Sequence, residues 1–187
     1  MNKKIIKPTP FGTVCVIWAV SNNSPRIVRI LLSMPGLSSE DQASELYPNS
    51  PTFSCAEIDA VAAAIKALLE GEAVVFSLEV ADFTLCSAFQ RSVLRAEHAI
   101  PRGRVSTYRL IAAHLGISNG ARVVGNALAN NPFPLIVPCH RTIRSDRHLG
   151  GYQGGLEMKR VLLEREGIIF DKAGRVICKR LHYGKKG

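Results

Sequence analysis

RVSTYRLIAAHLGISNGARVVGNALAN, residues 104–130, has the spacing of two short helices joined by a tight turn. Ser106 or Thr107 can cap the first helix, and Gly116 can adopt the left-handed conformation that ends it. Ser118 can cap the second helix. Two short helices joined by a few residues that include glycine form the helix-turn-helix pattern. The stretch therefore predicts a DNA-binding fold, although tandem helices are also common in proteins that do not bind DNA.

The second of these helices, ARVVGNALAN, carries small residues and a single charge, Arg122. A helix that reads bases in the major groove usually brings several long polar side chains. Small residues allow a closer approach, which suits the narrower minor groove, where base readout is degenerate. We therefore expect DNA binding with little sequence preference, and Arg122 could enter the duplex.

Further helices are predicted on both sides of this pair. Ser87-Ala88-Phe89-Gln90 has capping-box spacing and opens a helix that the turn Pro101-Arg102-Gly103 ends. Residues 156–166 have helical periodicity, and Gly167 can end that helix. The apolar run FPLIV, residues 133–137, is expected to be a short strand.

The first 85 residues have a different pattern. Residues 11–20 and 26–34 are rich in Val, Ile and Leu around the turn sequence SNNSP, which predicts a β-hairpin. We expect a loop over 35–51, a helix opened by a capping box at Ser54 and closed by Gly71, and a strand over 74–80. The chain is thus expected to hold an N-terminal α+β domain, residues 1–85, followed by a second domain, residues 86–187.

Charge separates the same two halves. Residues 1–85 carry 6 Lys and Arg against 9 Asp and Glu, whereas residues 86–187 carry 18 against 6. A basic excess confined to one region favours a polyanionic partner. The alternative is a generally basic, solvated surface.

Composition also limits the cellular setting. No apolar run approaches the length of a membrane span, and Pro8, Pro10 and Gly12 interrupt any apolar stretch of a signal peptide. The five cysteines are odd in number and lack paired spacing, which predicts neither a disulfide framework nor a zinc site. We expect a cytoplasmic protein without a bound metal.

VPCHR, residues 137–141, holds the strongest candidate nucleophile, Cys139. Free cysteines are often merely buried, so an inert core residue is the alternative. A thiolate nucleophile needs a base, and that base needs a carboxylate to orient it. His140 and Glu166 could serve, with a water between Cys139 and His140 because neighbouring side chains of an extended segment point apart. Glu166 lies in a last helical turn, where a carboxylate is disfavoured, and could instead be a salt-bridge partner.

PCHR, with NPFP before it and LGGYQGGLEMKRVLLEREG after it, resembles the O6-alkylguanine-DNA alkyltransferase family, the methylated-DNA–protein-cysteine methyltransferases. The similarity runs from about residue 87 to 167. It implies a small ribonuclease-H-like N-terminal α+β domain and a mainly helical, winged-helix-like DNA-binding and catalytic domain. It also implies DNA repair by direct reversal. The alkyl group of O6-alkylguanine, and of O4-alkylthymine, would pass irreversibly to Cys139 after base flipping, in a single turnover.

The resemblance implies a role for each matching residue. Cys139 would accept the alkyl group, His140 would act through water with Glu166 behind it, Tyr108 would donate a proton to the guanine, and Asn131 would hold the turn. The base pocket would be lined by Leu128, Val137, Leu149, Gly150, Tyr152 and Gln153. Arg122 would fill the space of the flipped base, and the other DNA contacts would be Thr107, Arg109, Ala121, Gly125, Asn126, Ala129 and Arg141. No cofactor would be required, and the partner would be double-stranded DNA bound by a monomer away from membranes.

Some residues depart from the family pattern. Thr142 stands where valine is more usual, Gln153 where a smaller residue often occurs, and SDRH, residues 145–148, replaces an Asp-Gly turn. These departures leave the preference among alkyl groups open. The basic tail, residues 179–187, could be a disordered arm on phosphates or a solvated end. A sequence-specific helix-turn-helix regulator and a cysteine hydrolase are the two rival functions.

Overall fold

The computed structural model describes residues 1–184 and divides into two compact units. Unit 1 comprises Met1–Leu85 and the short segment Pro132–Ile136. Unit 2 comprises Cys86–Asn131 and the chain from Val137 onward. No helix within residues 1–184 is both long enough and apolar enough to cross a membrane.

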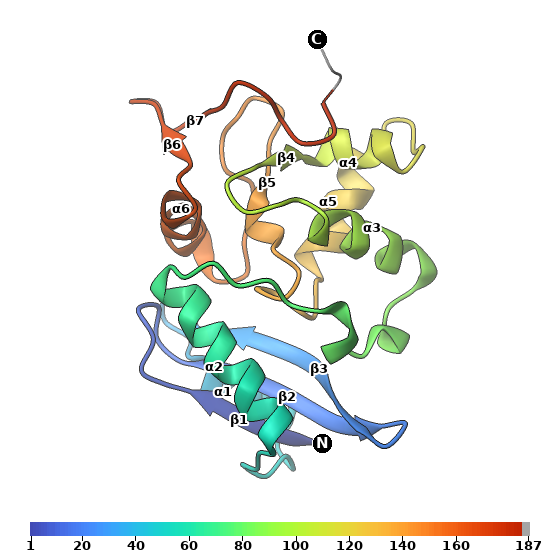
Figure 1. The fold of residues 1–187 in the computed structure, drawn as a ribbon, viewed down its shortest axis with the longest axis vertical. Coiled ribbons are helices and arrows are strands. Elements are labelled where there is room, and N and C mark those ends of the chain that lie inside the picture. The colour runs from blue at the N-terminus through green and yellow to red at the C-terminus, as the bar shows by residue number, and fades with distance from the viewer. Residues whose placement is uncertain (185–187) are drawn as a thin grey trace. The chain divides into compact units, whose positions relative to one another are not determined.

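Unit 1 is built on an antiparallel sheet of three strands in the order β1-β2-β3 (Figure 1). The strands are β1 (Asn2–Ile6), β2 (Val14–Ser21) and β3 (Ser24–Leu32). The predicted hairpin is confirmed. Asn22 and Asn23 form its turn with φ angles of 50° and 57°, as a two-residue hairpin turn requires. The sequence pattern did not predict β1.

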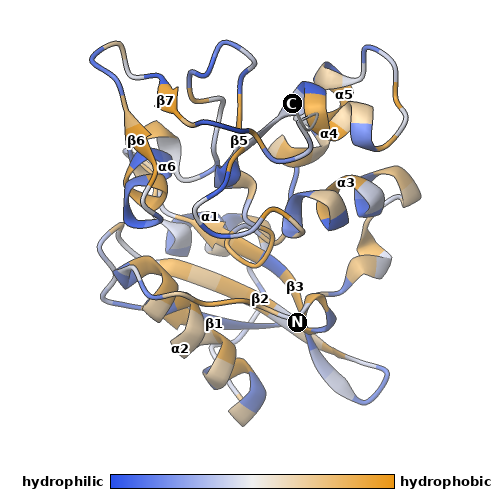
Figure 2. Ribbon diagram, turned by 45° about the horizontal axis from the view of Figure 1, so that its top comes forward, coloured by the Kyte–Doolittle hydropathy of each residue, from blue (hydrophilic) through white to orange (hydrophobic). Residues whose placement is uncertain are grey.

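Both faces of β2 are buried, since Val14 to Trp18 are each at most 2% exposed. Helix α1 (Ser39–Leu46) contacts β2 and β3, and helix α2 (Ala56–Glu70) contacts β1. One part of the core packs Cys15, Ile17 and Leu31 of the sheet against Ala43 of α1. Figure 2 shows β2 and α2 as mainly hydrophobic.

The prediction of a loop over 35–51 is wrong, because α1 lies within it. Ser38 caps this helix by accepting a hydrogen bond from the backbone N–H of Asp41. The predicted capping box at Ser54 is also wrong. Cys55 precedes α2, and the Ser54 hydroxyl donates instead to the Asp59 carboxylate. Gly71 ends α2 with a φ of 107°, as predicted.

The strands predicted over 74–80 and 133–137 are absent from the described chain. The first region is irregular, with one 3-10 turn, η1 (Leu78–Val80), and its Val75 is 89% exposed. A second 3-10 turn, η2 (Phe83–Leu85), follows. In the second region Leu135 takes a φ of 76°, which interrupts any extended run.

Unit 2 is mainly helical. Its helices are α3 (Ala88–His98), α4 (Tyr108–His114), α5 (Ala121–Ala129) and α6 (Gly155–Arg165). Ser87 and Thr107 cap α3 and α4 through their hydroxyls, and Gly116 takes a φ of 72°, all as predicted. The predicted cap at Ser118 is wrong, since Gly120 precedes α5 without a side-chain cap. Helices α4 and α5 contact each other as the helix-turn-helix prediction requires.

Two short strand pairs complete unit 2. β4 (Ser106–Thr107) runs parallel to β5 (Thr142–Ile143), and β6 (Ile169–Phe170) runs antiparallel to β7 (Val176–Ile177). A core of apolar residues lies among these strands and α6: Val105, Ile143, Leu163, Ile168 and Val176. The β4–β5 pair joins the start of α4 to the segment that follows Cys139. The prediction of a mixed α+β fold is confirmed.

The predicted basic tail is only partly described. Residues 180–184 pack on unit 2, where the backbone N–H of His182 donates to Val105 and its carbonyl accepts from Ser106. Residues 185–187 lie outside the described chain.

Candidate active site

Cys139 begins a 3-10 turn, η3 (Cys139–Arg141), directly after Pro138. The N–H of Cys139 donates to the carbonyl of Val137 over 2.8 Å, and that of Arg141 donates to Pro138 over 2.8 Å. The expectation of an extended segment here is therefore wrong. The tight backbone fixes the direction of the thiol, because the segment has two internal hydrogen bonds and a proline.

The thiol faces a pocket of about 290 Å³ within unit 2. Its lining residues come from α4, α5, η3 and the glycine-rich segment before α6: Tyr108, Gly125, Leu128, Ala129, Cys139, Gly151, Tyr152 and Gln153. Cys139 is 6% exposed, so the pocket is its route to a ligand. Sequence reasoning placed Gly125 and Ala129 on DNA rather than in the pocket.

The other residues predicted for the pocket, Val137, Leu149 and Gly150, are not among its lining residues. Val137 is buried and supplies the carbonyl that holds Cys139, and Leu149 packs on the core between α6 and the short strands. Gly150 lies under Tyr108, and a Cβ at this position would come within 2.2 Å of the tyrosine Oη. A glycine at 150 is thus needed for Tyr108 to lie where it does.

Asn131 holds the turn from the side. Its Nδ2 donates to the Val137 carbonyl over 3.2 Å and to Sγ of Cys139 over 3.4 Å. Gln153 donates in turn to the carbonyls of Asn131 (2.7 Å) and Ala129 (3.2 Å). These contacts tie the end of α5 to the nucleophile.

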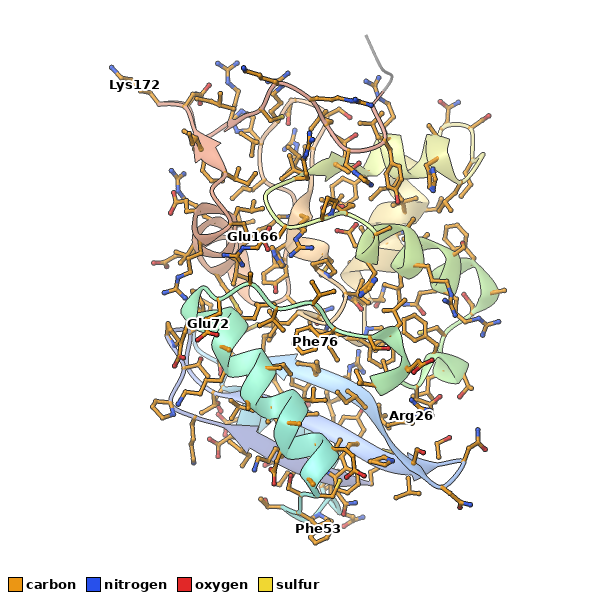
Figure 3. All side chains as sticks on the ribbon, in the orientation of Figure 1. Arg26, Phe53, Glu72, Phe76, Glu166 and Lys172 are labelled. Carbon is orange, nitrogen blue, oxygen red and sulfur yellow. The ribbon has the colours of Figure 1, made fainter. Side chains whose placement is uncertain are left out.

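Glu166 follows the last turn of α6 and closes a buried charged cluster (Figure 3). Its Oε1 lies 3.0 Å from Nε2 of His140. Arg141 donates to both of its carboxylate oxygens, with distances of 2.8 to 3.1 Å, and to the carbonyl of Ile100 over 2.7 Å. Glu166 therefore contacts both the histidine and an arginine, as each of the two interpretations of this residue expected.

The prediction that Arg141 contacts DNA is wrong. It is 7% exposed, and its guanidinium is occupied by Glu166 and Ile100. An arginine held in this way fixes the turn and has no free face for a phosphate. Thr107 is also buried, at 2% exposed, because its hydroxyl caps α4.

Burial and pairing set the protonation states of the cluster. Burial raises the pKa of Cys139 to about 11, only partly offset by the hydrogen bond from Asn131. Burial also lowers the pKa of His140, although Glu166 acts against it. Burial alone would raise the pKa of Glu166, but hydrogen bonds from His140 and Arg141 lower it to about 2. At neutral pH the site thus holds a thiol, a neutral imidazole and a carboxylate.

The imidazole is oriented to accept a proton. When Nε2 of a neutral histidine donates to a carboxylate, its Nδ1 carries the lone pair. Nδ1 of His140 is buried and has no hydrogen-bond partner in the described structure, and the same holds for the hydroxyl of Tyr152. The rings of the two residues meet edge to face at 6.2 Å. Two unpaired polar atoms in one place favour a bound water there.

A second buried polar group, which sequence reasoning missed, lies in the same unit. Glu97 of α3 is fully buried and accepts a hydrogen bond from the Thr142 hydroxyl. Lys159 of α6 is also fully buried and donates to the Thr142 carbonyl over 2.6 Å and to Gly151 over 3.3 Å. The unusual threonine at 142 thus has a physical reason, since it pairs with a buried carboxyl. The signal for this group in the sequence was an acidic residue, Glu97, among the apolar residues of α3.

The residues predicted to contact DNA gather on α4 and α5. Arg109, Arg122, Asn126 and Ala129 are exposed. Ala121 and Gly125 are half-buried on the same helix. Within residues 1–184, no three His, Cys, Asp or Glu side chains are grouped so that they could bind a metal ion.

Residues 88–168 match the family model described as 6-O-methylguanine DNA methyltransferase, DNA binding domain. This segment is therefore similar to the DNA-binding domain of that family. A methylated-DNA–protein-cysteine methyltransferase of Methanothermobacter thermautotrophicus is 50% identical over 104 residues, which cover 56% of this chain and 58% of the relative. The predicted family resemblance is confirmed.

Solved structures extend the likeness to the fold of most of the chain. The O6-methylguanine methyltransferase of Mycobacterium tuberculosis superposes with a TM-score of 0.68 at 28% identity, over 88% of this chain and 92% of the other. The same organism's OGT in complex with DNA gives 0.67 at 27% identity, over 89% and 92%. The chain spans little more than half the length of the curated relatives it matches.

Proposed function

We propose that this chain repairs alkylated DNA by transferring the alkyl group of O6-alkylguanine, and of O4-alkylthymine, to Cys139. The observation that carries the proposal is the position of Cys139, a thiol that faces a pocket and lies on the turn that also holds His140. The likeness of residues 88–168 to methylated-DNA–protein-cysteine methyltransferases supports the same conclusion.

The first step is removal of the thiol proton. Because burial raises the pKa of Cys139 to about 11, the thiol needs a base at neutral pH. Nδ1 of His140 takes the proton through a bridging water, and Glu166 stabilises the imidazolium that forms. The 3.0 Å contact between His140 and Glu166 supports this assignment.

The second step is the transfer itself. Sγ of Cys139 attacks the alkyl carbon, a carbon–sulfur bond forms, and the bond from carbon to O6 breaks with its electron pair on the base. Tyr108 donates a proton to the leaving guanine. Burial raises the pKa of Tyr108 to about 12, so its hydroxyl is protonated and can donate. The proton that Cys139 gave to His140 then returns to Tyr108 through solvent, so Cys139 has lost one proton, the base has gained one, and the step balances without a cofactor.

The target base must leave the helix to reach Cys139, since its reacting atoms are enclosed in the duplex. We propose that α5 enters the minor groove of double-stranded DNA and that Arg122 fills the space of the flipped base. The small and exposed residues of α5 support this placement. Leu128, Tyr152 and Gln153 line the pocket for the extruded base.

We also propose that the chain works as a monomer in the cytoplasm, with domains 1–85 and 86–187. The division of the structure after Leu85 supports these bounds. The cysteines support a reducing compartment, since all five are free.

The proposal is tested by counting turnovers. With duplex O6-methylguanine in excess, the amount of guanine restored should equal the amount of chain and then stop, because a thioether is not readily hydrolysed. Cys139→Ala should restore none while still binding duplex. Continued restoration beyond one equivalent would instead indicate a turning-over hydrolase.

A further inference from the structure

A second pocket of unit 2, of about 540 Å³, is surrounded by cationic and titratable side chains. Arg104, His114, Arg180 and His182 all line it. Among the residues that the structure describes, no aspartate or glutamate does. Such an arrangement is costly without a ligand, because like charges repel and no lining carboxylate of the described chain offsets them.

The described end of the chain builds one wall of this pocket. The backbone of His182 is held by hydrogen bonds to Val105 and Ser106, each of 2.8 Å. The Tyr183 hydroxyl donates to the Ala96 carbonyl over 2.8 Å, and its ring stacks on His114 at 3.9 Å. The backbone of His182 and the ring of His114 are therefore each held by contacts within unit 2.

Tyr183 takes a φ of 62°, a left-handed conformation that tyrosine rarely adopts. Such backbone strain persists only where surrounding contacts enforce it, and it gathers at functional sites. The stacking and the hydrogen bond to Ala96 enforce it here. The segment thus holds a defined shape beside the cations.

The electrostatics agree with this geometry. Partial burial lowers the pKa of His182, and Arg104, His114 and Arg180 lower it further. His182 is therefore close enough to each of these three groups for their positive charge to disfavour its protonation. Arg180 has one long bond, of 3.4 Å, to the carbonyl of Gly184, which leaves other donors of its guanidinium for a ligand.

We propose that this pocket binds a phosphate group, and that the backbone of duplex DNA outside the lesion supplies it. Arginine favours phosphate because its planar donors match two oxygens at once. His114 ends α4, the first helix of the helix-turn-helix, and this helix crosses the DNA backbone in proteins that use the motif. The inference goes beyond alkyl transfer, and it holds or fails without Cys139.

The test compares two double variants of the full chain. Arg104→Gln/Arg180→Gln removes two cations from the pocket. Lys172→Gln/Arg144→Gln removes two exposed cations that do not line it, and Lys172 points away from unit 2 (Figure 3). Arg180→Gln alone provides a milder variant if the double one folds poorly. Reaction of Cys139 with free O6-benzylguanine should be equal in all of them.

Two probes distinguish the sources of phosphate. Sodium pyrophosphate should shift the ring resonances of His114 and His182 in the wild type and in the control, but not in the pocket variant. With unmodified duplex, the affinity of the pocket variant should decrease less steeply with salt. The magnitude of the slope of log affinity against log salt should fall by about 0.9 for each DNA phosphate that the variant no longer neutralises. The slope of the control should fall by less.

Each outcome either supports the proposed phosphate site or overturns part of the proposal. Loss of both responses in the pocket variant alone supports a site for the DNA backbone. Loss of the pyrophosphate response with an unchanged duplex slope supports a phosphate site but overturns DNA as its source. No pyrophosphate response in the wild type, or equally weakened responses in the pocket and control variants, overturns the proposal.

Discussion

Cys15 in unit 1 and Cys139 in unit 2 are buried thiols whose pKa values burial raises to about 11. Cys15 packs among apolar side chains, with Ile17, Leu31 and Ala43 beside it. Cys139 accepts a hydrogen bond from the Asn131 amide and faces a pocket, and His140 of the same turn pairs with Glu166 at the end of α6. The raised pKa is therefore common to a cysteine of the apolar core and to the proposed nucleophile. Reactivity depends on the base and the space around the thiol.

The same contrast extends to the whole of each unit. In unit 1 the buried polar side chains of the described chain are two serines, Ser39 and Ser50. Among its described residues, unit 2 buries eight that are polar or charged: Glu97, Ser106, Thr107, Asn131, His140, Arg141, Thr142 and Lys159. Burying polar groups costs stability unless they are paired. Unit 2 thus depends on the hydrogen bonds that pair its buried polar groups, among them Asn131 and His140 beside Cys139.

The largest expected effect comes from removing the carboxylate that distinguishes Cys139 from Cys15. Glu166→Gln keeps the size of the side chain but removes the charge that makes His140 a base. Reaction with O6-alkylguanine should slow by about 100- to 10,000-fold, the range of general-base assistance. Stopped-flow rates with duplex substrate measure this effect.

Glu164→Gln is the matched control for that variant. Glu164 belongs to the same helix but is exposed and pairs with Arg160 at the surface. Its replacement should leave the rate unchanged. Equal rates for Glu166→Gln and the wild type would reduce Glu166 to a partner of Arg141.

A smaller effect is expected where the pocket positions Tyr108. Gly150→Ala would place a methyl group 2.2 Å from the tyrosine Oη, so the ring must move. A displacement of about 1 Å at a reacting group can cost about 100-fold in rate. Reaction with free O6-benzylguanine should be slower by a factor of this order. Gly151→Ala, at the next residue, meets no protein atom within 4 Å and leaves Tyr108 in place, so it should slow the reaction less.

If both alanine variants reacted equally, Tyr108 would have no positional role in the transfer. The free base is the right substrate for this comparison because it needs no flipping. Effects on DNA binding then cannot mask effects on the pocket.

The smallest effect is on stability and tests the cost of the polar core of unit 2. Burial raises the pKa of Glu97 from its ordinary value of 4.5 to about 7. The folded chain therefore keeps the carboxyl proton at pH values at which the unfolded chain has already released it. Stability should therefore decrease as pH rises from about 4.5 to 7 and then level off. Glu97→Gln should remove this slope. Urea unfolding between pH 5 and 8 measures it.

Lys159 titrates over a different pH range from Glu97. Burial lowers its pKa to about 8, so its contribution changes above that pH and should persist in Glu97→Gln. A wild-type stability that does not fall between pH 5 and 7 would show that Glu97 is not strained by burial.

Local chemistry explains what could be predicted from sequence. The caps at Ser87 and Thr107 and the glycine ends at Gly71 and Gly116 act within one turn, so they are readable in the chain. Helix α1 was missed because only Ser39 and Ala43 of its residues are buried, which leaves almost no apolar stripe.

Long-range pairing explains what could not be predicted. The strands β4 and β5 have two residues each and pair across more than thirty positions, which no local pattern reveals. Arg141 looked like a DNA contact because nothing in the sequence places Ile100 and Glu166 against its guanidinium. The chemistry of Cys139 and His140 was readable, whereas the support from Glu97 and Lys159 depends on the fold.

The most direct test of the central claim compares the two buried cysteines in one experiment. After reaction with one equivalent of duplex O6-methylguanine, the chain is digested and its cysteine peptides are analysed by tandem mass spectrometry. One methyl group should be found on Cys139 in nearly every molecule, with Cys15 unmodified. Methyl groups on Cys15, or spread over several cysteines, would contradict the claim that the pocket and the His140–Glu166 pair make Cys139 the acceptor.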